Sequence, residues 1–488
     1  MEGNKSFVVP AKAGTQVSAA NLDSRFRGND GIPKDAPRID FPPMEGASVL
    51  ARWLGTAPRF DIMATLEKGP VCYTRVLGKR IYFVNDAEYV KRILLDNLAN
   101  YPKSVTYRNN LRPFLGDGLL ISEGDFWKRQ RRLAQPAFHL RRLKGLAATM
   151  AETAARMAQG WEHGRVIDVT PAMNAVTMEI VAKTLFGADV TNDIGTVADS
   201  MRVLGEESGR IRPTAFFDLP EFITKPRGRR FAEAVGALDA IIHRMVAQRR
   251  AEIEKGGEAR DDLLSMLLEA RDEESGQGMT DRQLRDELVT LFLAGHETTA
   301  VSLAWTFHLL ALNPAAEAKL HAEVDTVLAE KPAPAFDDLE RLPYARMVAE
   351  ESMRLYPPAY VFSRRAVADD QLGPWRMPAG SHIVISPYAL HRKRDYWNAP
   401  DAFMPERFAP GASPDRPKHA YIPFGGGPRI CIGNSFAMME HAIVLAAVAR
   451  RWRLESIPGH EVRTEPRVTL RPRGGLPMRV LSRNKEDP

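Results

Sequence analysis

Apolar positions recur at helical spacing along most of the chain after residue 141. An earlier stretch differs: V-C-Y-T-R-V at residues 71–76 and R-I-Y-F-V at residues 80–84 are rich in β-branched and aromatic residues and flank a Gly-Lys turn. This pattern predicts a β-hairpin. Asn85, with Glu88 three residues later, is predicted to cap the helix that follows. The chain is therefore expected to be mainly α with small β-sheets, an α+β fold.

Three helices are marked by their length or by the signals at their ends. The longest is predicted over residues 280–313, because Thr280 and Gln283 can form a capping box and an Asn-Pro pair ends the pattern. Its roughly 32 residues would extend about 48 Å, enough to cross a domain. A second helix has Pro343 in its first turn and ends before a Pro-Pro pair. A third, apolar helix is predicted over residues 434–452.

The pattern indicates one domain between two polar segments. Residues 1–40 are rich in Gly, Asn, Ser, Pro and Arg and show neither a strand nor a helix period, which predicts a disordered N-terminal extension. Residues 41–482 contain no repeat and no interdomain linker, so we expect a single domain there. Residues 483–488 form a polar C-terminal tail.

Composition narrows the setting in which the protein works. Cys72 and Cys431 are its only cysteines, so a disulfide framework is not expected and a reducing cytoplasm is. The longest apolar runs fall well short of the ~20 residues that a membrane span needs, so no membrane anchor is expected. The net charge of +6 is modest for 488 residues. We therefore expect a soluble, cytoplasmic monomer.

The segment F-G-G-G-P-R-I-C-I-G, residues 424–433, has the features of a loop that binds a metal through a thiolate. Its glycines let a flat ligand approach and leave backbone N–H groups free to point at sulfur. Cys431 precedes a predicted helix N-terminus, where the helix dipole should lower the pKa of its thiol. A buried structural cysteine is the simpler alternative. Zinc fits poorly, because no further ligands stand at the required spacing, whereas a lone thiolate suits haem iron.

This segment resembles the cysteine-loop signature of the cytochrome P450 superfamily, with Phe, Gly, Arg and Cys in register. Three further segments match that family: A-G-H-E-T-T at residues 294–299, E-S-M-R followed by P-E-R-F, and W-K-R-Q-R. The resemblance covers roughly residues 41–482 and is to soluble members of the bacterial type. It implies the cytochrome P450 fold. Haem b, iron protoporphyrin IX, would then be bound by Cys431 between the long central helix and the helix after the cysteine loop.

In the long helix, the resemblance implies that Ala294 and Gly295 border the space where O₂ binds over the iron. It also implies that Thr298 is the alcohol and Glu297 the acid of a pair that delivers protons. Without the resemblance, two neighbouring threonines in a helix would more simply pack or bond to backbone carbonyls.

The remaining matched segments are assigned to structure and to haem binding. E-S-M-R places Glu351 and Arg354 on one helical face, and the resemblance implies that they form a buried triad with Arg407. Indole and guanidinium groups suit the haem propionates. The residues implied to contact the cofactor are Trp127, Arg131, Arg364, Arg429, Phe424, Gly425, Gly433, Ala294 and Gly295.

The substrate and the electron donor are predicted as chemical classes. The apolar residues expected to border the substrate are Leu119, Leu120, Phe292, Ala294 and Ala359. Such a pocket suits a lipophilic molecule such as a fatty acid, a terpenoid or an aromatic compound. Residues 128–144 carry seven cations and no acid. The resemblance places them near the cysteine side of the haem, where an acidic ferredoxin or flavodoxin-type donor would dock. No groove-reading motif accompanies them, so nucleic acid is not an expected partner.

These residues predict a monooxygenase that hydroxylates or epoxidises a lipophilic small molecule with O₂. Its electrons should come from an external partner, because no fused flavin or iron–sulfur segment is visible. Two alternatives stay open. The same fold could serve a peroxide-using enzyme or an isomerase that needs no reductant, or it could serve a non-catalytic haem sensor. The intact pair of Glu297 and Thr298 favours the monooxygenase.

Overall fold

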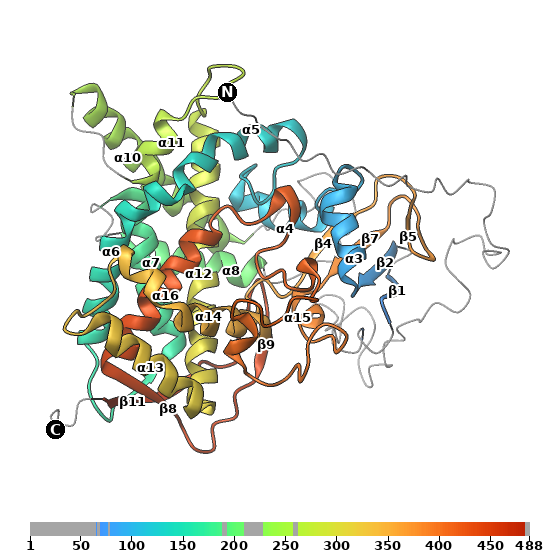
Figure 1. The fold of residues 1–488 in the computed structure, drawn as a ribbon. Coiled ribbons are helices and arrows are strands. Elements are labelled where there is room, and N and C mark those ends of the chain that lie inside the picture. The colour runs from blue at the N-terminus through green and yellow to red at the C-terminus, as the bar shows by residue number, and fades with distance from the viewer. Residues whose placement is uncertain are drawn as a thin grey trace, which may run out of the picture.

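The computed structural model describes residue 65 and residues 69–76, 79–187, 193–208, 228–256 and 262–483. The N-terminal extension predicted over residues 1–40 lies outside these residues, as does most of the polar tail. Figure 1 shows the helices gathered in one large part, with a small region of strands beside them.

Helices dominate the architecture, which confirms the prediction of a mainly α fold with small sheets. The helix that was predicted over residues 280–313 is α12, and the other two predicted helices are α14 and α16. The helical bounds are α3 Ala87–Lys91, α4 Val105–Leu115, α5 Gly124–Ala134, α6 Leu140–Gln159, α7 Val169–Phe186, α8 Ile194–Ser208, α10 Arg229–Glu254, α11 Leu263–Glu269, α12 Asp281–Leu312, α13 Pro314–Leu328, α14 Pro343–Leu355, α15 Pro387–Leu390 and α16 Asn434–Arg451.

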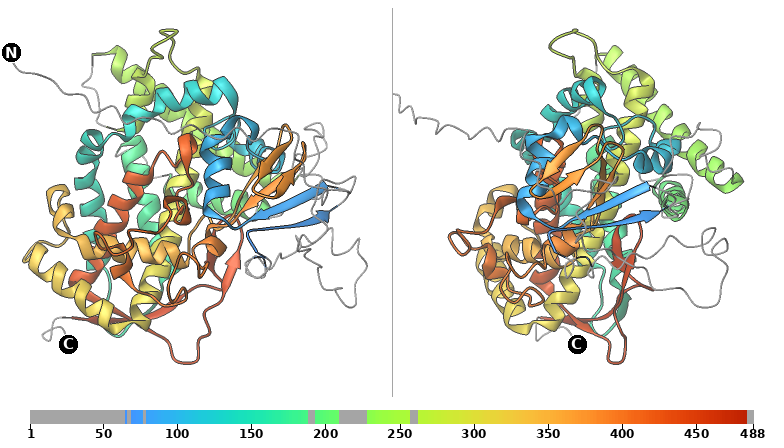
Figure 2. Two further views of the ribbon diagram at one scale, coloured as in Figure 1. Left: turned by 45° about the vertical axis from the view of Figure 1, so that its right-hand side comes forward. Right: turned by 90° about the vertical axis from the view of Figure 1, so that its right-hand side faces the viewer.

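The strands of the described residues form four small sheets. The largest has the order β1-β2-β7-β4 and lies beside the helical part (Figure 2). The predicted hairpin supplies the antiparallel pair β1 and β2, β7 runs parallel to β2, and β4 pairs antiparallel with β7. The other sheets have the orders β3-β11-β8, β10-β9 and β5-β6. The bounds are β1 Val71–Val76, β2 Lys79–Val84, β3 Val166–Asp168, β4 Phe362–Arg365, β5 Asp370–Leu372, β6 Trp375–Met377, β7 His382–Ile385, β8 Trp452–Ser456, β9 Thr464–Pro466, β10 Leu470–Pro472 and β11 Pro477–Ser482.

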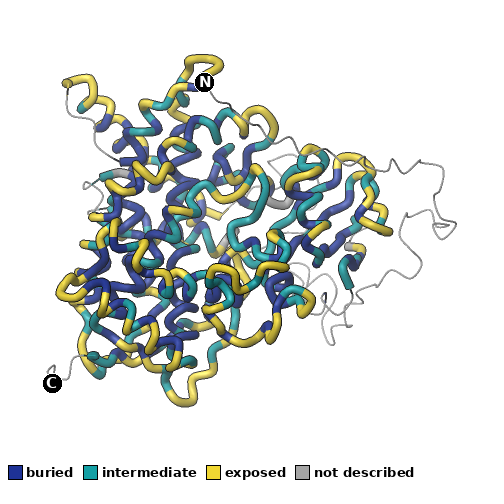
Figure 3. Tube along the Cα trace, in the orientation of Figure 1, coloured by how far each residue is buried: buried dark blue, intermediate teal, exposed yellow. Residues whose placement is uncertain are grey.

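The long helix α12 runs through the centre of the helical part (Figures 1 and 3). It contacts α7, α14 and α16, and most of its side chains are buried. A helix that is apolar on nearly all sides needs such surroundings. It begins with the predicted capping box: the Thr280 N–H donates to Gln283 Oε1 at 2.9 Å, and the Gln283 N–H donates back to Thr280 Oγ1 at 3.3 Å.

The predicted cap after the hairpin was wrong by one residue. The carboxylate of Asp86 caps α3, accepting the N–H groups of Glu88 at 3.0 Å and Tyr89 at 3.2 Å. The side chain of Asn85 is buried and donates instead to the carbonyl of Thr65 at 3.1 Å. Asn and Asp are equally good caps in isolation, so a tertiary contact decided between them.

Candidate functional site

The cysteine loop joins a short 3-10 turn, η9 (Gly427–Arg429), to α16. The Cys431 N–H donates to the Phe424 carbonyl at 2.9 Å, which closes the loop, and the Cys431 side chain is exposed. The surrounding protein raises the pKa of this thiol by desolvation, although the Gly433 N–H and Arg131 act to lower it. The sequence had predicted a lowered pKa. A thiol that binds a metal ion is nevertheless deprotonated outright.

Gly427 explains why this loop is rich in glycine. Its φ is 66°, and a Cβ at this position would lie 2.0 Å from the carbonyl oxygen of Leu94. Leu94 belongs to η1 (Arg92–Asp96), the π-turn that follows α3. Any larger residue would push this turn away from the loop, so the glycine fixes the backbone that carries Cys431.

Halfway along α12, the helix borders open space. Ala294 is exposed and Gly295 is half-buried, although Phe292 and Leu293 just before them are buried. The Thr298 hydroxyl donates to the Ala294 carbonyl at 2.7 Å, and the next threonine donates to the Gly295 carbonyl at 3.1 Å. These bonds back to residue i−4 can bend a helix locally.

Glu297 points toward a different element from its neighbour Thr298. Its carboxylate accepts the hydroxyl of Thr469 at 2.8 Å, at the turn between β9 and β10. The Trp305 indole donates to the Leu470 carbonyl at 2.7 Å and ties the same turn to α12. The acid is therefore held by a contact that the sequence did not reveal.

A crowded group of cations lies at the start of α5 and near the cysteine loop. The Arg429 guanidinium lies 4.9 Å from the centre of the Trp127 ring and pairs with Glu123. Lys103, which the sequence reading missed, forms an isolated β-bridge with Arg364. Burial lowers the pKa of Lys103 to about 7, opposed by Glu123, and the two arginines lower it further.

This cation group fits an anionic ligand. Like charges held together in a buried place destabilise one another unless anions compensate them, and among the described residues the acids that act on Lys103 are Glu123 and Glu287. Charge-assisted bonds from arginine and lysine are what carboxylates such as haem propionates require. Together with an exposed thiol and an exposed stretch of α12, the donor set suits haem.

Arg131, which was predicted to contact the haem, lies next to the cysteine loop. Its Nη1 donates to the Ile430 carbonyl at 2.8 Å, and its Nε donates to Gln135 Oε1 at 2.7 Å. In this arrangement Arg131 supports the cysteine loop next to Cys431.

The structure brings Glu351, Arg354 and Arg407 together. Both oxygens of Glu351 accept from Arg354, at 2.6 and 2.8 Å, and Arg407 Nε lies 3.3 Å from the same carboxylate. The side chains of Glu351 and Arg354 are fully buried. Arg354 also donates to the carbonyls of His391 and Pro400 at 2.9 and 2.6 Å. The charges are thus fully satisfied inside the protein.

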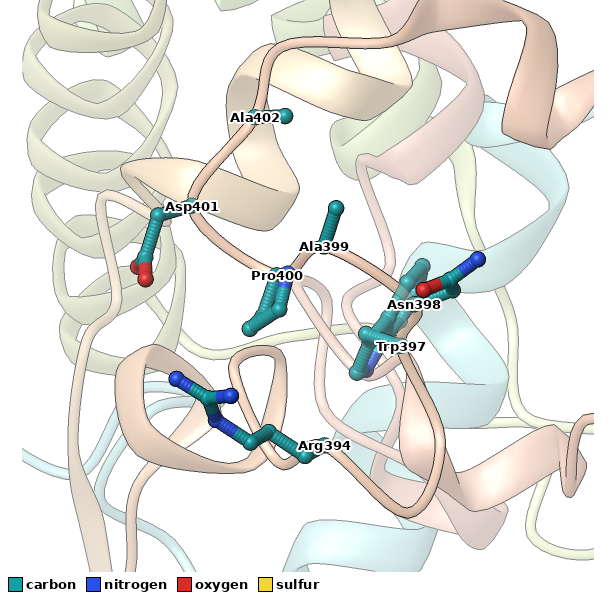
Figure 4. Close-up of a pocket in the computed structure, with 7 residues that line it drawn as sticks. All are labelled: Arg394, Trp397, Asn398, Ala399, Pro400, Asp401 and Ala402. Atoms are coloured by element: carbon teal, nitrogen blue, oxygen red, sulfur yellow. The ribbon is translucent and has the colours of Figure 1, made fainter.

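A surface recess of about 440 Å³ is lined by residues of the segment 394–402, which contacts the triad (Figure 4). Its lining residues are Arg394, Trp397, Asn398, Ala399, Pro400, Asp401 and Ala402. None of them was predicted as a site residue, and the backbone of this segment is fixed by Arg354 and Arg407, which donate to three of its carbonyls. We therefore regard the recess as the outer side of the triad.

The five residues predicted to border the substrate differ in exposure. Leu120 is 38% exposed and Leu119 only 8%. Ala294 and Ala359 are exposed, whereas Phe292 is buried with its ring 5.5 Å from that of His296. Phe292 therefore packs inside the protein in this conformation.

The basic segment 128–144 is less free than its sequence indicates. Lys128 pairs with Asp125 at 2.8 Å, and Arg132 pairs with Asp272 at 2.5 Å. Lys144 pairs with Asp337 at 2.8 Å. Arg141 and Arg142 are exposed.

Two features of the described residues concern membranes and bare metal ions. No helix there combines the length and the apolar character that a membrane crossing requires. No three His, Cys, Asp or Glu side chains in the same part of the chain gather into a site for a bare metal ion.

Comparisons with known proteins agree with this geometry. Residues 51–476 match the family model described as Cytochrome P450. The chain is 36% identical to cyclooctatin synthase of Streptomyces melanosporofaciens over 422 residues, which cover 86% of this chain and 88% of that protein. It is 32% identical to pentalenene oxygenase of Streptomyces avermitilis over 394 residues, 80% of this chain and 86% of that protein. It is 33% identical to putative cytochrome P450 132 of Mycobacterium tuberculosis over 433 residues, 85% and 90% of the two chains.

Proposed function

Because the chain belongs to the cytochrome P450 family of haem b monooxygenases, we propose that it hydroxylates or epoxidises a terpenoid, with electrons from a ferredoxin or flavodoxin-type protein. The single observation that carries the chemistry is the exposed Cys431 thiol, presented by a closed loop at the start of α16. Dependence on a substrate, O₂ and a redox partner follows from the family.

The choice of a terpenoid rests on relatives and on apolar side chains. One relative, 37% identical over 393 residues, is named cyclooctat-9-en-7-ol 5-monooxygenase, and another is pentalenene oxygenase. Leu119, Leu120, Ala294 and Ala359 offer an apolar lining without charge, which suits a large hydrocarbon skeleton. A fatty acid or an aromatic compound would suit the same lining, and the relatives favour the terpenoid.

The residues of this chain would hold the cofactor from two sides. Cys431 would bind the iron, and the propionates would be bound by Trp127, Arg131, Arg364 and Arg429, with Lys103 beside them. Haem iron with a thiolate ligand supplies the binding of O₂ and the cleavage of its O–O bond. Phe424, Gly425 and Gly433 would leave room for the ring beside the thiolate.

Thr298 and Glu297 would handle protons beside the open stretch of α12. The Thr298 hydroxyl, now bonded to the Ala294 carbonyl, would turn and donate a proton into the space that Ala294 borders. Glu297 would replace that proton after leaving Thr469, its present partner. An acid and an alcohol next to each other are suited to stepwise proton transfer.

The electron donor would dock near the N-terminus of α6. A Cβ at Gly433 would lie 3.8 Å from the Phe138 ring, so this end of the helix adjoins the cysteine loop. Arg141 and Arg142 are exposed there, and an acidic partner would be attracted to them. We also propose that residues 41–482 form one domain and that the protein acts as a cytoplasmic monomer.

The proposal is tested by titrating purified ferric protein with a panel of terpenoids, fatty acids and aromatic compounds while following the spin state of the iron. Compounds that bind are then incubated with a surrogate ferredoxin system, and the products are analysed by mass. We expect terpenoids to bind and to gain one oxygen atom only when electrons are supplied. Products formed with peroxide alone, or without net oxidation, would favour a peroxygenase or an isomerase. Binding without any product would favour a sensor.

A further inference from the structure

The loop of residues 116–122 lies against α12 at a point where two acidic side chains are buried. Glu287 is 0% exposed and Asp286 is 5% exposed, and neither is among the residues proposed to contact the haem. The same loop carries Leu119 and Leu120, which border the proposed substrate space. Buried carboxylates are costly unless they are bonded, so their partners show what they do.

Both carboxylates accept backbone N–H groups of this loop. Asp286 Oδ2 accepts the N–H of Asp117 at 2.9 Å, and Glu287 Oε2 accepts the N–H of Leu119 at 3.0 Å. The second oxygen of Glu287 accepts the side-chain amide of Gln130 on α5 at 3.3 Å. One pair of acids therefore joins the loop and α5 to α12.

At its two glycines the loop fits against α12 without space for a side chain. A Cβ at Gly116 would lie 2.1 Å from the carboxylate of Asp286, and one at Gly118 would lie 2.2 Å from the hydroxyl of Thr290. Gly116 has a φ of 60°, in the left-handed region that favours glycine. Close approach of the backbone is what lets short acidic side chains reach the N–H groups.

Charged neighbours hold the two acids in place. Arg285 Nη1 lies 3.0 Å from Asp286 Oδ1 and donates to the Phe114 carbonyl at 2.7 Å, and Arg285 pairs with Asp239 on α10 at 2.6 Å. Lys103 faces Glu287 and donates to the carbonyls of Leu119 and Ser122 at 2.8 and 3.0 Å. These bonds hold the loop from its other side.

We propose that Glu287 and Asp286 are positioning residues that latch residues 116–122 onto α12, and so control how Leu119 and Leu120 close the substrate space and how fast a ligand enters it. The inference rests on the proposed function for the identity of that space. The acids lie seven and eight residues before Ala294, which is about 11 Å along a helix. They therefore act through the loop and do not touch the reacting atoms.

The test uses haem-loaded protein and two measurements, residue-level hydrogen exchange and the rate at which 4-phenylimidazole binds. Glu287→Met has nearly the same shape but accepts the Leu119 N–H poorly, whereas Glu287→Gln keeps an acceptor oxygen. Asp281→Asn, an exposed change in the first turn of the same helix, is the control. In Glu287→Met we expect Leu119 to exchange about 10- to 100-fold faster and the ligand to bind several-fold faster. Glu287→Gln and Asp281→Asn should stay close to the wild type.

Hydrogen exchange of the wild-type protein tests the proposed latch even if Glu287→Met does not fold. Slow exchange at Asp117 and Leu119 supports the latch, and exchange at the rate of free peptide overturns it. Equal loop exchange and equal ligand binding in Glu287→Met and the wild type would also overturn it. A wild-type protein without the thiolate-type absorption band in the reduced, carbon monoxide-treated state would instead contradict the haem-based function, and it would leave the exchange result valid.

Discussion

Two groups of buried charges in this protein serve different purposes. In the triad, Glu351 accepts from two arginines, and the remaining donors of Arg354 meet backbone carbonyls. In the group around Lys103, the described residues that act on the amine are two arginines and two glutamates, and burial lowers the pKa of the amine to about 7. A buried network that satisfies itself has a structural role, whereas one with an excess of a single charge is suited to bind a ligand of the opposite charge.

The largest effect should come from removing one charge of the triad, in which the charges compensate one another. In Glu351→Ala, Arg354 would keep its buried charge without a carboxylate, and such a loss costs about 3–5 kcal/mol. We expect little folded, haem-loaded protein, measured as haem content after purification and as the midpoint of urea unfolding. The matched control is Glu461→Ala, which removes an exposed pair with Arg463 and should behave as the wild type. Normal haem content in Glu351→Ala would show that the triad is dispensable.

The second effect is a dependence of the protein's stability on pH, which arises from Lys103 in the ligand-binding group. In the unfolded chain the amine of Lys103 is protonated below about pH 10.4, but in the folded protein only below about 7. Stability is therefore lost as pH falls from about 10 to 7, by up to about 5 kcal/mol, and no further loss follows below 7. Urea unfolding of haem-free protein should show this slope, and Lys103→Met should lack it.

Haem should reduce this dependence, because propionates would stabilise the charged amine. An equal slope of stability against pH with and without haem would show that Lys103 does not contact the propionates.

A smaller effect is expected from removing one cation of the same group. Arg364→Met should weaken haem binding by about 1.5–3 kcal/mol, the worth of a hydrogen bond to a charged group, while the haem-free protein keeps its fold. Transfer of haem to excess apomyoglobin measures the change, with far-ultraviolet circular dichroism as the check on folding. If Arg364→Met unfolded as Glu351→Ala is expected to, the distinction between the two groups would fail.

The smallest effect concerns charges on the surface. Reduction of the iron by an acidic carrier should slow several-fold between about 0.05 and 0.5 M salt, because the Debye length becomes shorter than typical charge separations. Arg141→Glu should slow it further at low salt and remove part of the salt dependence. Arg463→Glu, in another exposed segment, is the control. Stopped-flow reduction measures both, and a rate indifferent to salt would place the docking surface elsewhere.

Local signals in the sequence predicted the helices that carry the site. Thr280 with Gln283 and Pro343 marked where α12 and α14 begin, and the apolar run after Cys431 predicted α16. Capping and proline act over a few residues, so they can be read without a fold. The sequence did not show that Asp86, and not Asn85, caps α3. The partner that binds Asn85, Thr65, lies 20 residues away in the chain.

The sequence by itself determined the family, the chemistry of the cysteine loop and the ends of the principal helices, since each depends on neighbouring residues. Only the tertiary structure decided which distant groups meet. It placed Lys103 against Arg364, Thr469 against Glu297, and the loop of residues 116–122 against two acids of α12. Burial and long-range pairing set the strength of these contacts, and both arise only when segments far apart in the chain pack together.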